Sequence, residues 1–318
     1  MINEQFFKTI KQYIDIDFPE TIITFLRNEY TRRLFFKQLD SSVLNNYLYQ
    51  CFNLWLGRYA CEYDSHLADY FSGKNNLDFI CSEFIKFCFK NEIKIDAEKT
   101  LQSFVVHNQF SDNAVRNELI KITPKSHLNL LGFGLDQGCY EKELAQYLLK
   151  KGIADNVTVY GMDPYAKKSQ DIYYLTPSQL AAEPKIRFDI IIARWVLHHV
   201  SLQYRWSDLI QCLNHCSSDA KILFIEHGFL QKPPSLIEEK LYLLLNAIFD
   251  IIANIGLRPC YFTENTAPLR SNFFIRYLKP NDFSEITKNL PYLNLSQNTY
   301  NVGPVFPNQT ILCIASKS

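Results

Sequence analysis

From residue 127 to the end of the chain, short apolar runs with strand character alternate with amphipathic helical runs. This alternation is typical of a doubly wound α/β fold, because parallel strands need a helical crossover between them. We therefore predict a mostly parallel, seven-stranded sheet. The predicted strands are 127–131, 156–161, 171–175, 188–193, 220–226, 292–297 and 309–316. Only a short loop with Gly and Pro separates the last two, so we expect them to pair antiparallel.

Residues 1–120 show a different pattern, with few glycines and many large apolar residues at helical spacing. The pattern predicts an all-α domain over 1–120 and an α/β domain over 121–318. Predicted helices include 41–70, 78–91 with Asp78 as N-cap, and 112–121. The aromatic residues of this region are interpreted as core; the alternative is a dimer interface or a pocket wall.

Charge and cysteine content exclude several classes of protein. The 33 Lys and Arg residues balance the 33 Asp and Glu residues, so the chain lacks the positive field that binding to nucleic acid requires. The nine cysteines are scattered and no leader segment precedes them, which favours a reducing cytoplasm. Cys212, His215 and Cys216 could share a helical face, but we interpret them as buried thiols and predict no metal.

The most apolar stretch, 241–257, is interrupted by Asn246, Asp250 and Asn254 at four-residue spacing. These residues form a polar stripe on one helical face, whereas a membrane span needs about 20 apolar residues without such a stripe. We therefore predict no membrane span; docking on a membrane surface is the alternative.

A glycine turn follows the first predicted strand, in the sequence LLGFGLDQG (130–138). Gly132 and Gly134 allow a tight turn and close approach to a ligand, and a helix beginning near Gly138 presents free amide groups there. Position 137 is Gln, where a dinucleotide fold has its third glycine. Asp163 lies at the end of the second strand, where a carboxylate accepts ribose hydroxyls. The alternative for Asp163 is a helix cap.

Two further segments carry a family resemblance: FDIIIARWVLHHV (188–200), followed by Trp206, Ser207 and Asp208, and ILFIEH (222–227). With the glycine turn and Asp163, they resemble class I S-adenosylmethionine-dependent methyltransferases, closest in motif to small-molecule O-methyltransferases. The resemblance covers about 190 residues. It implies a Rossmann-like domain, S-adenosylmethionine as cofactor, an antiparallel seventh strand, and a helical N-terminal domain that forms a homodimer or covers the substrate cleft.

The resemblance also implies a set of cofactor-binding residues. They are Gly132, Phe133, Gly134, Asp136, Met162, Asp163 and Arg194. The chain departs from the family at Leu130, where an acid usually holds the methionine moiety, and at Asp136, where a glycine is usual. Asn129 or Asp136 could replace the missing acid, or cofactor binding could be weakened or lost. Thr176, Ser178 or Gln179 would have to hold the adenine.

The catalytic role implied by the resemblance falls on His198, which follows the fourth strand. Methyl transfer to a hydroxyl needs a base, and an imidazole with a pKa of about 6.5 suits that task near neutral pH. Glu226 or His227, at the end of the fifth strand, would orient the base or the substrate. The alternative is that His199 faces the cleft instead.

Residues 231–276 form a predicted helical insertion in the α/β domain. We expect a hydrophobic lid that carries Tyr261, Phe262, Phe273 and Phe274 near a small apolar or aromatic acceptor. Packing against the N-terminal helices is the alternative. The sequence thus predicts a cytoplasmic small-molecule methyltransferase. The alternatives are a protein or peptide methyltransferase and a catalytically inactive, methyltransferase-like binding or scaffold protein.

Overall fold

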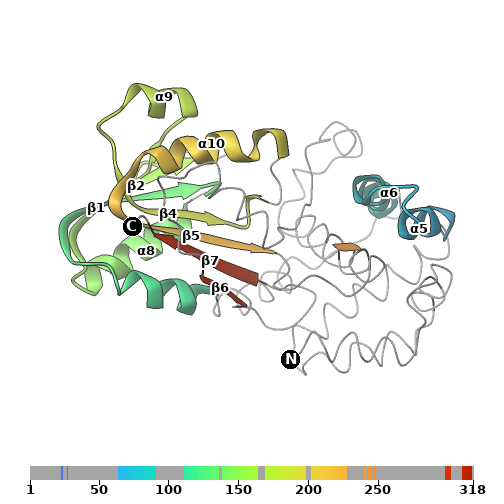
Figure 1. Cartoon of the computed structure of the whole chain (residues 1–318), viewed down its shortest axis with the longest axis horizontal. Coiled ribbons are helices and arrows are strands. Elements are labelled where there is room, and N and C mark those ends of the chain that lie inside the picture. Colours follow the sequence, from blue (N-terminus) through green and yellow to red (C-terminus); the bar gives the residue numbers. More distant parts are fainter. Residues whose placement is uncertain are drawn as a thin grey trace. The chain divides into compact units, whose positions relative to one another are not determined.

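The described residues of the computed structural model are 64–90, 111–135, 138–163, 169–197, 202–227, 298–301 and 310–316, with Ile23, Arg27, Lys240, Leu243, Leu244 and Ala247 (Figure 1). The chain divides into two compact units. One holds Met1–Asn108, Lys232–Ile275 and Pro304–Asn308, and the other holds Gln109–Gln231, Arg276–Gly303 and Gln309–Ser318. The predicted boundary after residue 120 and the predicted insertion at 231–276 stay predictions.

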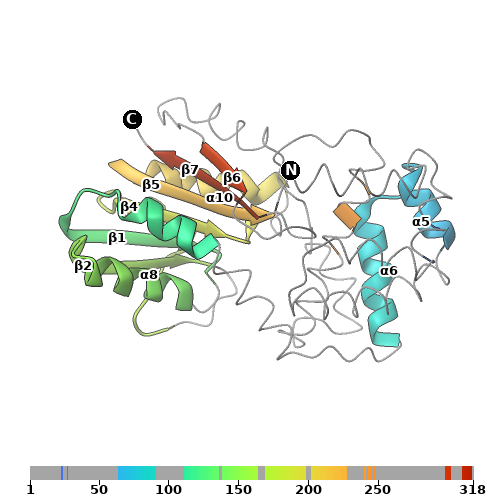
Figure 2. The same ribbon diagram turned by 90° about the horizontal axis from the view of Figure 1, so that it is seen from below.

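The first unit contains helices α5 (Asp64–Phe71) and α6 (Leu77–Lys90), which Figure 2 shows beside each other. The helices are separated by a turn at 72–76, and Asn76 Oδ1 accepts a hydrogen bond of 2.9 Å from the Phe79 N–H. Asn76 therefore caps α6, and the prediction of Asp78 as N-cap was wrong, since the cap precedes the first helical residue, Leu77. Among the described residues, none of the helices has the length and hydropathy to cross a membrane.

The second unit is built on one sheet with the strand order β3-β2-β1-β4-β5-β7-β6. Its strands are β1 (Lys125–Phe133), β2 (Ala154–Met162), β3 (Tyr173–Tyr174), β4 (Phe188–Arg194), β5 (Cys216–His227), β6 (Asn298–Asn301) and β7 (Thr310–Ser316). The first five pair in parallel, and β7 pairs antiparallel with both β5 and β6. The predicted strand at 292–297 lies outside the described residues, and β6 begins just after it.

Both faces of this sheet are covered by helices, which explains the continuous apolar runs of its central strands. Leu128 and Leu130 of β1 pack with α8 (Cys139–Lys150) and with the helical segment 111–119 on one face. Leu131 and Phe133 pack with α9 (Pro177–Ala182) and α10 (Leu202–Asn214) on the other. Figure 1 shows α8 and α10 on opposite sides of the strands.

The strand register brings several chain turns to one edge of the sheet. Phe133, the last residue of β1, pairs with Met162 of β2 and with Ala193 of β4. Because parallel strands run in the same direction, the segments that follow these residues leave the sheet side by side. The glycine turn, Asp163 and Arg194 therefore begin at the same carboxyl edge, where α/β folds bind ligands.

Strand β5 begins at Cys216, four residues before the predicted start. Three of the four extra residues, 217–219, are polar, so hydropathy did not reveal them. A charge cluster holds them in place, since Lys125 Nζ lies 2.7 Å from Asp189 Oδ1 and 2.8 Å from Asp219 Oδ1. The hydroxyl of Ser217 donates to Asp189 at 3.1 Å. This cluster fixes the amino end of the sheet, away from the carboxyl edge.

Candidate functional site

Gly134 makes the first turn after β1 in a conformation that favours glycine. Its φ is +70°, and its N–H donates to the Met162 carbonyl at 2.9 Å, which closes the turn against β2. A Cβ at this position would lie 2.1 Å from Val196 Cγ2. Gly134 is therefore required both by its backbone and by the close approach of the segment that follows β4.

Gly132 is required by a different neighbour, the side chain of Glu141. A Cβ on Gly132 would lie 2.8 Å from Glu141 Cγ, so the missing side chain leaves room for that carboxylate. Glu141 stands in the first turn of α8 and is only 3% exposed. The helix follows Gly138, which adopts φ +69° at the N-cap position, as the sequence predicted for the start of this helix.

Apart from Arg194, which is described below, the remaining predicted cofactor residues divide into three groups. Phe133 and Met162 have buried side chains in the hydrophobic core, so only their backbone atoms face the carboxyl edge. Asp163 follows β2 directly and is half-buried at that edge. Asp136 lies outside the described residues. Phe133 and Met162 were predicted from their positions in the glycine turn and at the end of the second strand. Position in a motif does not distinguish a core side chain from one that contacts a ligand.

Glu226 is a fully buried carboxylate at the end of β5, with an exposed fraction of 0%. Its Oε1 accepts hydrogen bonds from the N–H groups of Val196 at 2.8 Å and of Leu197 at 2.7 Å. Carboxylate–amide bonds of this kind are strong, because one partner carries a full charge. Glu226 therefore anchors the segment that leads into the two predicted catalytic histidines.

The predicted catalytic histidines His198 and His199 lie outside the described residues, as does the side chain of His227. The residue that starts their segment, Trp195, has φ 51°, an uncommon value for a large side chain. Its N–H donates to the Ile225 carbonyl at 2.7 Å, which holds this backbone against β5. The segment after β4 thus donates three backbone hydrogen bonds to β5, two to Glu226 and one to Ile225.

Arg194, the last residue of β4, lies in a partly buried charged cluster. Its guanidinium stacks on the ring of Tyr140 at 3.8 Å and on the ring of Trp195 at 4.4 Å. Its Nη2 lies 3.4 Å from Asp112 Oδ1 in the helical segment 111–119. Burial raises the pKa of Asp112, and the charge of Arg194 opposes this rise. Burial also raises the pKa of Tyr140.

Sequence reasoning missed Asp112, Tyr140 and Glu141. A signal for Glu141 was present, because the buried face of α8 consists of Glu141, Leu144, Ala145 and Leu148. These positions follow the i, i+3, i+4, i+7 spacing of a core-facing stripe, on which a carboxylate is unexpected. An acid on the apolar stripe of a predicted helix is a recognisable sign of a buried polar site.

Three of the polar residues considered as replacements for missing family contacts, Asn129, Thr176 and Gln179, are engaged elsewhere. Asn129 donates from Nδ2 to the Arg187 carbonyl at 2.8 Å, and its N–H donates to Asp189 Oδ2 at 2.9 Å. Thr176 and Gln179 form a capping box at the start of α9. The side chains of these residues therefore already satisfy neighbouring backbone groups.

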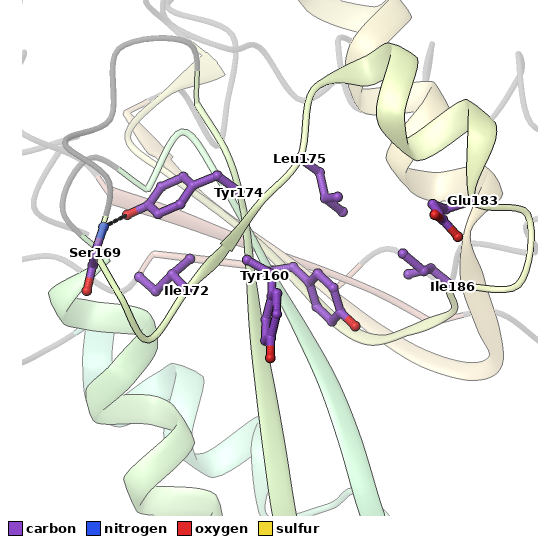
Figure 3. A pocket seen from close by; sticks show the side chains of 8 residues that line it. Tyr160, Ser169, Ile172, Tyr174, Leu175, Glu183 and Ile186 are labelled. Carbon is purple, nitrogen blue, oxygen red and sulfur yellow. Dashed lines mark hydrogen bonds between the residues drawn. The ribbon is translucent and has the colours of Figure 1, made fainter.

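An open groove of about 530 Å³ lies beside the edge strand β3 of the described sheet (Figure 3). Its lining residues are Tyr160, Ser169, Ile172, Tyr173, Tyr174, Leu175, Glu183 and Ile186. None of them belongs to the predicted site. In Figure 3 the groove lies between β2, β3 and the segment that follows α9. Its lining residue Ile172 also packs beside Gly138, since a Cβ on Gly138 would lie 2.1 Å from Ile172 Cδ1.

Within the described parts of the chain, no three His, Cys, Asp or Glu side chains are grouped so as to hold a metal ion. Cys212 and Cys216 are buried thiols. The Cys212 Sγ lies 3.5 Å from Met162 Sδ, and burial raises the pKa of the Cys212 thiol. His215 Nδ1 lies 3.1 Å from the Ile186 carbonyl. These contacts place the three residues in packing roles.

Residues 108–250 match a protein-family model described as a methyltransferase domain. Among solved structures, the chain is similar to the CurJ carbon methyltransferase at 12% identity and a TM-score of 0.42, over 91% of this chain and 70% of that one. It is similar to an O-methyltransferase family protein from Burkholderia thailandensis at 10% identity and a TM-score of 0.44, over 70% of this chain and 59% of that one. A third similar structure is magnesium protoporphyrin IX methyltransferase from Synechocystis PCC 6803 with bound SAH, at 14% identity and a TM-score of 0.39, over 67% and 84%. No curated protein matches the chain.

Proposed function

We propose that the chain is an S-adenosylmethionine-dependent methyltransferase that methylates a small apolar or aromatic acceptor at oxygen. The methyltransferase-domain model that residues 108–250 match and the strand order of the sheet support this proposal. The N-terminal domain is proposed to form a homodimer or to cover the substrate cleft. The insertion at 231–276 is proposed to act as a lid over the acceptor.

The residues at the carboxyl edge fit the cofactor in their chemistry. S-adenosylmethionine has ribose hydroxyls, a sulfonium and an amino-acid end. Asp163 is a half-buried carboxylate directly after β2, where it can accept hydrogen bonds from hydroxyl groups. Arg194 is a cation at the same edge, and its Nη2 is paired at 3.4 Å with Asp112 Oδ1. Its buried Nε and Nη2 have no hydrogen-bond acceptor among the described residues, and donors of this kind suit an anionic group.

One observation carries the catalytic part of the proposal. Glu226 accepts two backbone N–H bonds from Val196 and Leu197, directly before His198. The same segment contacts the glycine turn, because Val196 fills the space beside Gly134. The chain that enters His198 is therefore held at the edge where the cofactor residues converge. Positioning of this kind is the main contribution that a protein makes to a cofactor's own chemistry.

When bound, S-adenosylmethionine supplies an electrophilic methyl group on sulfur. His198 is proposed to accept the hydroxyl proton of the acceptor as the acceptor oxygen forms its bond to the methyl carbon and the carbon–sulfur bond breaks. The step balances, because loss of the methyl group would leave S-adenosylhomocysteine, a neutral thioether, as the other product. Glu226 acts in this scheme as a positioning residue, since it holds the backbone before His198.

We predict that His198→Ala lowers the methylation rate of an acceptor found by screening phenols by about 10²- to 10⁴-fold, the usual contribution of a general base. Cofactor affinity should stay at the wild-type value, because the proposed base contacts the acceptor. The rates are measured by mass spectrometry of the product.

His199→Ala is the matched control and should retain most of the activity. A loss confined to His199→Ala, with His198→Ala near wild type, would overturn the assignment of His198. Carbon-13 NMR of the product made with a labelled methyl donor identifies the accepting atom. A methyl signal on carbon would contradict methylation at oxygen.

A further inference from the structure

Glu141 supplies a carboxylate at the place where β1 itself has none. Leu130 is fully buried in the core on the α8 face of the sheet. The side chain of Glu141 approaches this edge from α8 instead, with its Cδ 3.0 Å from the position that a Cβ of Gly132 would take. The carboxylate of Glu141 is thus buried beside the glycine turn.

Arg194 brings a positive charge to the same turn. Phe133 pairs with Ala193, so Gly134 and Arg194 are the next residues of two neighbouring strands. Tyr140 precedes Glu141 in α8 and stacks on the Arg194 guanidinium, which places both charged residues beside Tyr140. An arginine keeps its charge at all relevant pH values and presents donors in one plane.

The Arg194 donors are held in place and are only partly used. Stacking between two rings limits rotation of the guanidinium, and the side chain is 13% exposed. The distance from Nη2 to Asp112 Oδ1 is 3.4 Å, which is longer than an ordinary charged hydrogen bond. Among the described residues, Nε and Nη2 have no hydrogen-bond acceptor. A ligand carboxylate would meet a preorganised planar donor group.

We propose that Glu141 binds the ammonium group and Arg194 binds the carboxylate at the amino-acid end of the cofactor. The inference rests on the proposed function. The amino-acid end is a zwitterion with its ammonium and carboxylate groups on the same carbon atom, and the two side chains present the opposite charges beside one glycine turn. The first turn of α8 thus provides the acid that β1 lacks, and Asp163 binds the ribose hydroxyls.

Three adenosine compounds separate the two contacts in titration calorimetry. S-adenosylhomocysteine has both groups, its decarboxylated analogue has only the ammonium, and 5′-methylthioadenosine has neither. Glu141→Gln should weaken binding of the first two by about 10- to 100-fold and leave methylthioadenosine unchanged. Arg194→Met should weaken S-adenosylhomocysteine by a similar factor and leave the other two compounds unchanged.

Glu143→Gln is the matched control, because Glu143 is exposed on the same helix, and it should bind all three compounds as the wild type does. If Arg194→Met fails to fold, Arg194→Lys takes its place, because lysine keeps the charge that faces Asp112. Arg194→Lys should also lose affinity for S-adenosylhomocysteine, since it lacks the planar donor group. Wild-type affinity of Glu141→Gln for S-adenosylhomocysteine would overturn the proposal. An equal loss for methylthioadenosine would overturn it too, since it would show a structural role. If the wild type binds none of the three compounds, the proposed cofactor site is ruled out, and the proposed function with it.

Discussion

Gly134→Ala is expected to lower the free energy of unfolding by about 3 kcal/mol. The left-handed backbone costs an alanine about 1 kcal/mol, and overpacking against a buried neighbour adds about 1–3 kcal/mol. The neighbour is Val196, whose Cγ2 lies 2.1 Å from the position of the new Cβ. In a domain of this size, the melting temperature should fall by about 6–12 °C in differential scanning calorimetry.

Gly152→Ala is the matched control for this variant. Gly152 has φ +68°, close to that of Gly134, but a Cβ there meets no atom within 4 Å. It should therefore lose only the backbone contribution of about 1 kcal/mol, or about 2–4 °C. Equal melting temperatures for the two variants would show that Val196 moves aside at little cost. That result would contradict the packing described for the glycine turn.

Glu226→Leu is expected to have an effect of similar size, about 2–4 kcal/mol, for a different reason. The substitution leaves the N–H groups of Val196 and Leu197 without their acceptor in a largely buried place, and each such group costs about 1–3 kcal/mol. Because the segment that leads to His198 loses its anchor, turnover should fall as well. Urea unfolding and the methylation rate measure the two effects.

Glu226→Gln separates the hydrogen bonds from the charge. Its amide oxygen can still accept both bonds, so the loss of stability should stay near 1 kcal/mol. Turnover should recover most of the wild-type value, since the backbone before His198 regains its anchor. A glutamine variant as inactive as the leucine variant, with near-native stability, would contradict a positioning role. It would instead assign Glu226 a direct part in the chemistry.

The sheet could be predicted from hydropathy wherever strands are buried on both faces. β1 and β4 are continuous apolar runs, and their central parts agree with the predicted ranges. The start of β5 was missed because Ser217 and Asp219 are held by Lys125 and Asp189, and a polar network of this kind leaves no periodic signal. The antiparallel pairing of β7 with its neighbours was confirmed.

The site could be predicted only in part, because a motif fixes positions along the chain and not the directions of side chains. Gly134 was predicted to bind the cofactor, and the space that its missing side chain leaves is filled by Val196. Glu226 or His227 was predicted to orient the base or the substrate, and Glu226 accepts its hydrogen bonds from the backbone before His198. The roles of these residues in the site stay predictions. The cluster of Arg194 with Asp112 and Tyr140 joins elements far apart in sequence, so local reasoning could not find it.

The carboxyl edge of the sheet is proposed to bind S-adenosylmethionine, with Asp163 facing the ribose. Titration calorimetry of the purified chain with S-adenosylmethionine and S-adenosylhomocysteine, repeated with Asp163→Ala, measures this binding. Both compounds should bind the wild type with micromolar affinity, and the variant should lose about 10- to 100-fold, since a charged hydrogen-bond acceptor is removed. Absence of binding to the wild type would rule out the proposed cofactor site and favour a methyltransferase-like binding or scaffold protein. Unchanged binding to Asp163→Ala would remove Asp163 from the site.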